Sequence, residues 1–150
     1  MKIHIRQVPP EGRHIEGEEP AAILDLSELG MVPLTPVRYS LDAGLSEGGL
    51  FATGELGVDL ECRCVSCLEQ FALPVRVDDF ACQVELAGRE EIDLTEPIRE
   101  DILLALPAHP RCDMVGGKVC PGLKLPADAS PSGDEAPPPV WAALDQLKIR

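Results

Sequence analysis

Residues 56–84 read LGVDLECRCVSCLEQFALPVRVDDFACQV, and this stretch predicts two antiparallel strands joined by a turn. Before the turn, apolar residues alternate with charged ones from Leu56 to Cys64, as expected for a half-buried strand. A second alternating run begins at Phe71. The motif Cys64-Val-Ser-Cys67 lies between the two runs, so we expect it in or near the turn of a β-hairpin.

The second run also predicts a local irregularity at Asp78-Asp79. Apolar residues before and after this pair fall on alternate positions, but the later set is displaced by one residue. The two sets are Phe71, Leu73, Val75 and Val77, and then Phe80, Cys82, Val84 and Leu86. A slip of one residue is typical of a β-bulge.

Other elements follow from the same patterns. Residues 2–8 and 37–42 alternate between apolar and polar side chains, which predicts strands. Residues 11–20 are acidic and interrupted by glycine and proline, which predicts a loop. Residues 23–29 fit a helix and a strand equally. A helix is expected at about 96–106, with Thr95 as N-cap and Pro107 as its stop. Its apolar face would contain Ile98, Ile102, Leu103 and Leu106.

These elements predict an α+β fold. We expect an antiparallel, partly barrel-like sheet with one packed helix, a cysteine-rich loop and a C-terminal helix. Residues 1–125 form the single expected domain. Residues 126–139, with five prolines, are typical of a flexible linker, and residues 140–150 predict a short amphipathic helix.

The composition narrows the possible partners. The 150 residues are 45% apolar and 3% aromatic, and the net charge is −13. Such a chain favours basic protein partners over a phosphate backbone. No stretch approaches the roughly 20 apolar residues of a membrane span, and the N-terminus lacks a signal-peptide core. We therefore expect a cytoplasmic protein with reduced thiols, no membrane contact and no small-molecule substrate.

Six cysteines make a metal site the main chemical candidate. Cys64 and Cys67 have the spacing of a zinc knuckle, and Cys112 and Cys120 can complete a Cys₄ shell for Zn²⁺. The second pair is separated by seven residues, more than is usual, so His109 and Cys62 are alternative ligands. Ordinary thiols without metal are the other interpretation. Cys62 and Cys82 fit best as small apolar residues of the core.

Catalysis has less support. A reactive CxxC motif usually begins a helix, whereas Cys64 and Cys67 are flanked by predicted strands. The three histidines, His4, His14 and His109, occur in unrelated settings, and no serine has a nucleophile motif around it. The sequence therefore predicts a protein that is not an enzyme.

A small basic region lies beside the proposed metal ligands. Arg111, Lys118 and Lys124 are accompanied by a single acid, Asp113, and Arg63 from the hairpin is positioned to join them. These four cations are candidate contacts for nucleic acid phosphates. Scattered solvated charges are the alternative interpretation, because no aromatic stacking platform accompanies them.

Four segments carry a resemblance to a known family. They are Cys64-Val-Ser-Cys67-Leu-Glu-Gln-Phe71; residues 92–107, IDLTEPIREDILLALP; Pro110-Arg-Cys112 with Cys120-Pro121; and residues 141–147, WAALDQL. In order and spacing they resemble the YceD family, the large ribosomal RNA subunit accumulation proteins of bacteria and plastids. The resemblance covers most of the chain from about Val37 onward.

The resemblance implies a cytoplasmic, non-enzymatic factor needed for normal levels of large-subunit ribosomal RNA. Its implied partners are that RNA, its precursor or a basic ribosomal protein. The family's cysteine pairs match Cys64 with Cys67 and Cys112 with Cys120. Two features differ: Ser66 stands where the family often has arginine, and residues 122–126 lack a further cysteine. A zinc-clipped acidic adaptor or chaperone unrelated to ribosomes is the alternative function.

Overall fold

The computed structural model describes residues 1–46 and 48–122. Seven strands, one α-helix and four short 3₁₀ helices lie within these residues. The bounds of the elements, in chain order, are β1 (Lys2–His4), η1 (Ile5–Gln7), β2 (Arg13–Glu19), η2 (Ala21–Leu24), η3 (Ser27–Leu29), β3 (Val32–Pro33), β4 (Val37–Ser46), β5 (Gly49–Arg63), β6 (Gln70–Glu85), β7 (Glu91–Asp93), α1 (Thr95–Leu104) and η4 (Cys112–Met114).

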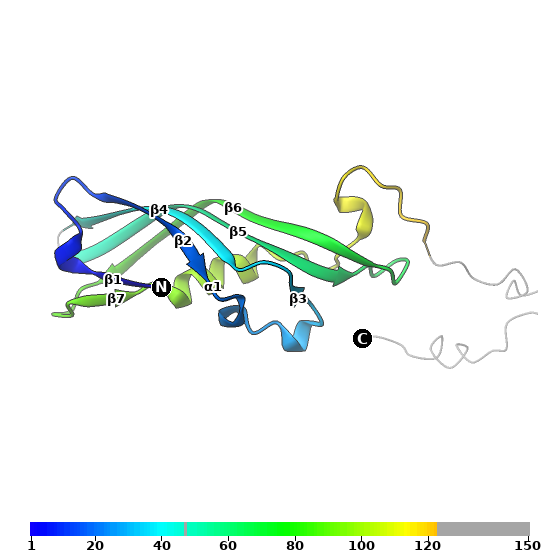
Figure 1. The fold of residues 1–150 in the computed structure, drawn as a ribbon, viewed down its shortest axis with the longest axis horizontal. Coiled ribbons are helices and arrows are strands. Elements are labelled where there is room, and N and C mark those ends of the chain that lie inside the picture. The colour runs from blue at the N-terminus through cyan, green and yellow to red at the C-terminus, as the bar shows by residue number, and fades with distance from the viewer. Residues whose placement is uncertain (47, 123–150) are drawn as a thin grey trace, which may run out of the picture.

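The main sheet is built on the long β5–β6 hairpin, which runs the length of the structure (Figure 1). β4 pairs with the first part of β5 and β3 with its end, both antiparallel, and β2 pairs with β4. The predicted α+β class with an antiparallel sheet is confirmed. The sheet is not a closed barrel among the described residues, because β2 pairs only with β4 and β6 only with β5.

The bulge predicted at Asp78-Asp79 is present. Gly54 pairs with Phe80 and Leu56 pairs with Val77, so one residue of β5 lies opposite two residues of β6. Phe80 is consequently brought into the core on the displaced phase, with 1% of its surface exposed. The bulge therefore lets one strand of 16 residues keep its apolar side chains inward along its length.

A smaller sheet and the helix complete the core. β1 pairs antiparallel with β7, and α1 follows β7 directly and contacts β6, β5 and η2. Ile98 and Ile102 of α1 are fully buried, as the apolar pattern predicts. Thr95 is the first helical residue and not the N-cap, which is Leu94. The Thr95 backbone N–H and hydroxyl both donate to the carboxylate of Asp93, at 2.9 and 2.6 Å.

Three predictions about the N-terminal third need correction or completion. The predicted strand at residues 2–8 ends at His4 and continues as the 3₁₀ helix η1. The loop predicted at residues 11–20 is wrong, because β2 pairs with β4 along seven positions there. The ambiguous stretch 23–29 forms parts of η2 and η3. The missing Cβ of Gly17 leaves space for the Tyr39 ring, which explains how an acidic, glycine-containing segment fits an edge strand.

One continuous apolar core joins the sheets and the helix. Its largest fully buried side chains come from β4, β5, β6, β7 and α1 and from the segment around η2, and they include Leu24, Leu41, Leu50, Leu60, Phe80, Ile92 and Ile98. Within the described part of the chain, no helix combines the length and the apolar character needed to span a bilayer. The proposed linker at 126–139 and the proposed helix at 140–150 lie outside the described residues.

Candidate metal centre

The Cys64–Cys67 motif forms the turn at the end of the β5–β6 hairpin, as predicted. The Cys64 N–H donates to the Glu69 carbonyl at 2.9 Å, and the Leu68 N–H donates back to the Cys64 carbonyl at 3.0 Å. Leu68 adopts a left-handed conformation, with φ of 64°, which closes the turn. These backbone bonds point the chain so that both thiols face the same side.

The segment after α1 returns to this turn and supplies the second cysteine pair. The Val65 N–H donates to the Pro110 carbonyl at 3.0 Å, which fixes the returning chain against the hairpin end. Cys112 then begins η4, and two left-handed glycines, Gly116 and Gly117, turn the chain so that Cys120 faces the other thiols. We call residues 64–69 together with 110–120 the cysteine tip (Figure 1).

The four sulfur atoms form a compact cluster. All lie within 4.8 Å of one another, with 3.8 Å between the sulfurs of Cys64 and Cys120 and 3.7 Å between those of Cys67 and Cys112. A tetrahedral zinc with Zn–S bonds of about 2.3 Å requires sulfurs about 3.8 Å apart. All six cysteines are free thiols, so no disulfide competes for the four. The cluster can hold a metal ion.

The surroundings of the thiols shift their pKa values in opposite directions. Burial opposes ionisation of Cys64, but backbone hydrogen bonds from Cys67, Cys112 and Ser66 outweigh it and lower the Cys64 pKa to about 6. Burial and the three neighbouring thiols raise the pKa of Cys112 to about 12. A backbone hydrogen bond from Glu69 favours the Cys67 thiolate, but burial and the thiols of Cys64 and Cys120 outweigh it and raise the pKa of Cys67. Four thiolates this close therefore need a cation to be stable together.

The alternative ligands do not join the cluster. Among the described residues, the only set of cysteine, histidine and carboxylate groups close enough to share an ion consists of the four cysteines. Cys62 is on the core face of β5, where burial raises its pKa, and it is 1% exposed. Cys82 is half-buried on β6, and burial raises its pKa as well. Both positions agree with the prediction of small apolar core residues.

The candidate cations are distributed around the cysteine tip. Arg63 and Arg111 each precede a cluster cysteine, and both side chains are exposed, as is Lys118. The Arg111 guanidinium donates to the Asp113 carboxylate at 2.6 Å, so part of the basic charge is neutralised locally. Lys118 takes part in no ion pair within the described residues. Lys124 lies outside them.

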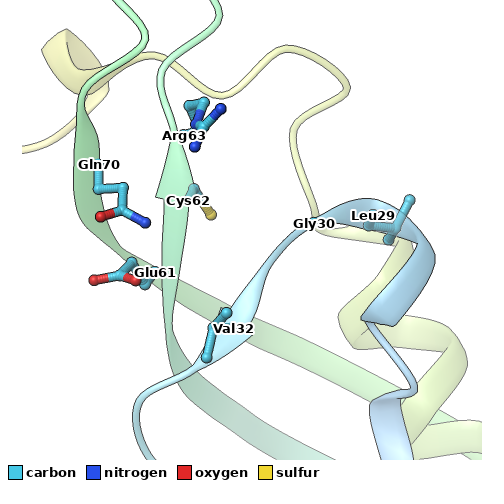
Figure 2. A pocket seen from close by; sticks show the side chains of 7 residues that line it. All are labelled: Leu29, Gly30, Val32, Glu61, Cys62, Arg63 and Gln70. Carbon is cyan, nitrogen blue, oxygen red and sulfur yellow. The ribbon is translucent and has the colours of Figure 1, made fainter.

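A hollow of about 430 Å³ adjoins the cysteine tip, and sequence reasoning missed it. Figure 2 shows the turn that carries Leu29 and Gly30 lying across this hollow from Cys62 and Arg63 at the end of β5. Val32, Glu61 and Gln70 complete its lining. The only sequence signal was the apolar stretch 23–29, whose pattern did not show which of its residues would stay exposed.

The chain was also compared with known proteins. A scan against protein-family models, a search of curated proteins and a search of solved structures each found no match. The chemistry of the site is therefore inferred from the positions of its four thiols and their neighbours.

Proposed function

We propose that this chain is a cytoplasmic, non-enzymatic factor that supports the accumulation of large-subunit ribosomal RNA, and that its cysteine tip holds one structural Zn²⁺. The ribosomal part of the proposal is supported by the resemblance of four ordered segments to the YceD family. The metal part is carried by a single observation, the convergence of four thiols from segments 45 residues apart in sequence.

The donor set favours a structural ion over a catalytic one. Catalytic zinc sites usually have three protein ligands and keep one position open for water or substrate, whereas four thiolates close the shell. Cys64 has no exposed surface, which disfavours direct attack by or on an external disulfide. The function that fits this arrangement is to fix the returning loop against the hairpin end.

The charge of the protein favours a basic ribosomal protein as the direct partner. The net charge is −13, and complementary charge speeds and orients association with a basic protein. RNA is the weaker candidate, because phosphate binding scales with the number of free cations and Arg111 is already paired with Asp113. The acidic surface would bind the basic ribosomal protein first. The candidate RNA contacts are then Arg63, Lys118 and Lys124.

The ribosomal role is tested by deleting the protein in the cells that make it. The expected result is a fall in the ratio of large-subunit to small-subunit ribosomal RNA, restored by the wild-type chain and restored poorly by Cys64→Ser/Cys67→Ser. An unchanged ratio would show that the ribosomal role is wrong and would leave the acidic adaptor as the better hypothesis.

The choice of partner has its own test. The purified chain is mixed with a basic large-subunit ribosomal protein or, separately, with large-subunit RNA, and complex formation is followed by gel filtration at rising salt. We expect a complex that weakens steeply with salt and survives Lys118→Ala. A complex that forms only with large-subunit RNA and is lost on Lys118→Ala would reverse the order of the two candidates.

A further inference from the structure

An apolar groove with no occupant among the described residues lies beside the cysteine tip. It encloses about 510 Å³, within the size range of binding sites for small ligands and side chains. It lies between the η3 turn, the end of β5 and the segment that follows α1, and it shares Leu29, Gly30 and Arg63 with the hollow of Figure 2. Its apolar walls are formed by Leu29, Met31, Val65, Leu103, Leu106 and Pro110.

The groove leaves large apolar side chains unpaired. Leu29 is 56% exposed and Val65 is 52% exposed, although both face a concave apolar surface. Leu103 and Leu106 lie at the groove while partly packed on the core, so the groove is continuous with the interior. An exposed apolar surface of this kind, with polar residues at its edge, is typical of a docking site.

We propose that the C-terminal segment 140–150 of the same chain docks in this groove as an amphipathic helix. Its sequence, VWAALDQLKIR, places Val140, Ala143, Leu144 and Leu147 at positions i, i+3, i+4 and i+7. This spacing is the recognition pattern of a helix that lies in an apolar groove. The proposal does not depend on the ribosomal role, but it requires an ordered cysteine tip, because Val65 and Pro110 of the tip line the groove.

The connection permits the contact. The chain leaves the described structure at Gly122, two residues after Cys120. The sulfur of Cys120 lies 3.8 Å from that of Cys64, which is at the end of the hairpin. The groove is lined by this same end of the hairpin. Residues 123–139 can span up to about 56 Å when fully extended, more than the return to a neighbouring surface requires. Tethering at this range gives an effective concentration near the millimolar level, so a modest intrinsic affinity is sufficient.

Charge favours the same occupant. Segment 140–150 carries Lys148 and Arg150 against Asp145, on a chain whose net charge is −13. The charged residue that lines the groove itself is Arg63, and Glu61 lines the adjoining hollow, so the attraction comes from the net charge of the whole chain. A locally basic helix is therefore attracted to this acidic domain, whereas a second acidic copy of the whole chain is repelled by it.

Trp141 provides a direct test, because it is the only tryptophan of the chain. The full-length protein should show tryptophan emission shifted to the blue of the denatured protein, with weak quenching by acrylamide at every protein concentration. Leu29→Glu in the groove and Leu144→Glu in the segment should each restore emission and quenching to those of the isolated 140–150 peptide.

Matched controls separate docking from general damage. Leu104→Glu adds the same charge on an 82% exposed residue of α1 outside the groove, and Gln146→Glu adds it off the apolar face of the segment. Both should leave the emission unchanged, and circular dichroism should show that Leu29→Glu remains folded. If it does not, Val65→Glu, at a second groove position that is 52% exposed, replaces it with the same expected result.

Three results would overturn the proposal. The first is emission of the intact protein equal to that of the free peptide. The second is a blue shift that disappears on dilution, which would assign the groove to a second copy. The third is a concentration-independent blue shift that survives Leu144→Glu, or survives Leu29→Glu in a folded protein, which would place Trp141 elsewhere.

Discussion

The body of the sheet and the cysteine tip are two regions of one hairpin that are stabilised in different ways. In the body, Phe80, Leu50 and Leu60 are almost completely buried. In the tip, Leu68, Met114 and Val119 are 57%, 57% and 90% exposed, and four thiols lie together instead of an apolar core. The comparison indicates that apolar burial folds the body. For the tip, which has four clustered thiols in place of an apolar core, we propose that a metal ion cross-linking the cysteines supplies the order.

The largest effect is expected from a core substitution in the body. Phe80→Ala removes a buried ring at the bulge and should lower the free energy of unfolding by about 3–5 kcal/mol. Urea unfolding followed by circular dichroism measures this loss. Phe51→Ala, at a 40% exposed position of β5, is the matched control and should cost about 1 kcal/mol. Equal losses would contradict the assignment of Phe80 to the core.

A smaller loss is expected at the bulge itself. Gly54 has φ of 152°, and a Cβ there would overlap the carbonyl oxygen of Ser40 on β4. Gly54→Ala should therefore destabilise the body by about 2 kcal/mol in the same unfolding experiment. Gly48→Ala also has a positive φ but meets no neighbouring atom, so it should cost about 1 kcal/mol. If Gly54→Ala lowers the free energy of unfolding no more than Gly48→Ala does, the predicted overlap with the Ser40 carbonyl is wrong, because β4 can then shift to accommodate the added Cβ.

Metal removal should act on the tip and spare the body. With a chelator present, amide hydrogen exchange of Cys64, Val65 and Leu68 should accelerate by about tenfold or more, because their hydrogen bonds belong to the cysteine tip. Amides in the paired centre of β4 and β5 should change little. Uniform acceleration along the hairpin would mean that the body needs the metal as well.

The smallest effect concerns an exposed ion cluster on the body. The carboxylates of Asp42 and Glu16 lie 2.8 and 3.1 Å from the His14 ring nitrogens, and these hydrogen bonds raise the His14 pKa above 6.5. The raised pKa adds stability that is complete below pH 6.5 and disappears as the pH rises through the folded-state value. An NMR titration should show the His14 pKa falling in Asp42→Asn. An unchanged pKa would contradict the assigned contact.

Much of the body could be predicted because its strands bury one face. Alternation of apolar residues located the cores of β4, β5 and β6, and the change of phase at Asp78-Asp79 located the bulge. β2 was missed because its residues are acidic and half-exposed, and its strand conformation depends on pairing with β4. Propensity of an edge strand is set by such neighbours more than by its own sequence.

The sequence predicted which cysteines form the cysteine tip, but not the contacts that hold the tip in place. Spacing alone nominated the four cysteines, and the structure brings them together. Spacing did not show that the Pro110 carbonyl receives the Val65 N–H, or that Arg111 pairs with Asp113. These contacts depend on how the chain returns from α1, which no local pattern encodes. The apolar groove was missed for the same reason, since its walls come from three separate segments.

The most direct test of the central claim is the metal content of the purified protein by elemental mass spectrometry, with Cys64→Ser/Cys67→Ser as the comparison. The account predicts about one zinc per wild-type chain and none in the double variant, with loss of protection confined to the cysteine tip. A metal-free wild-type protein with an equally protected tip would contradict it, because four neighbouring thiols would then be stable without a cation.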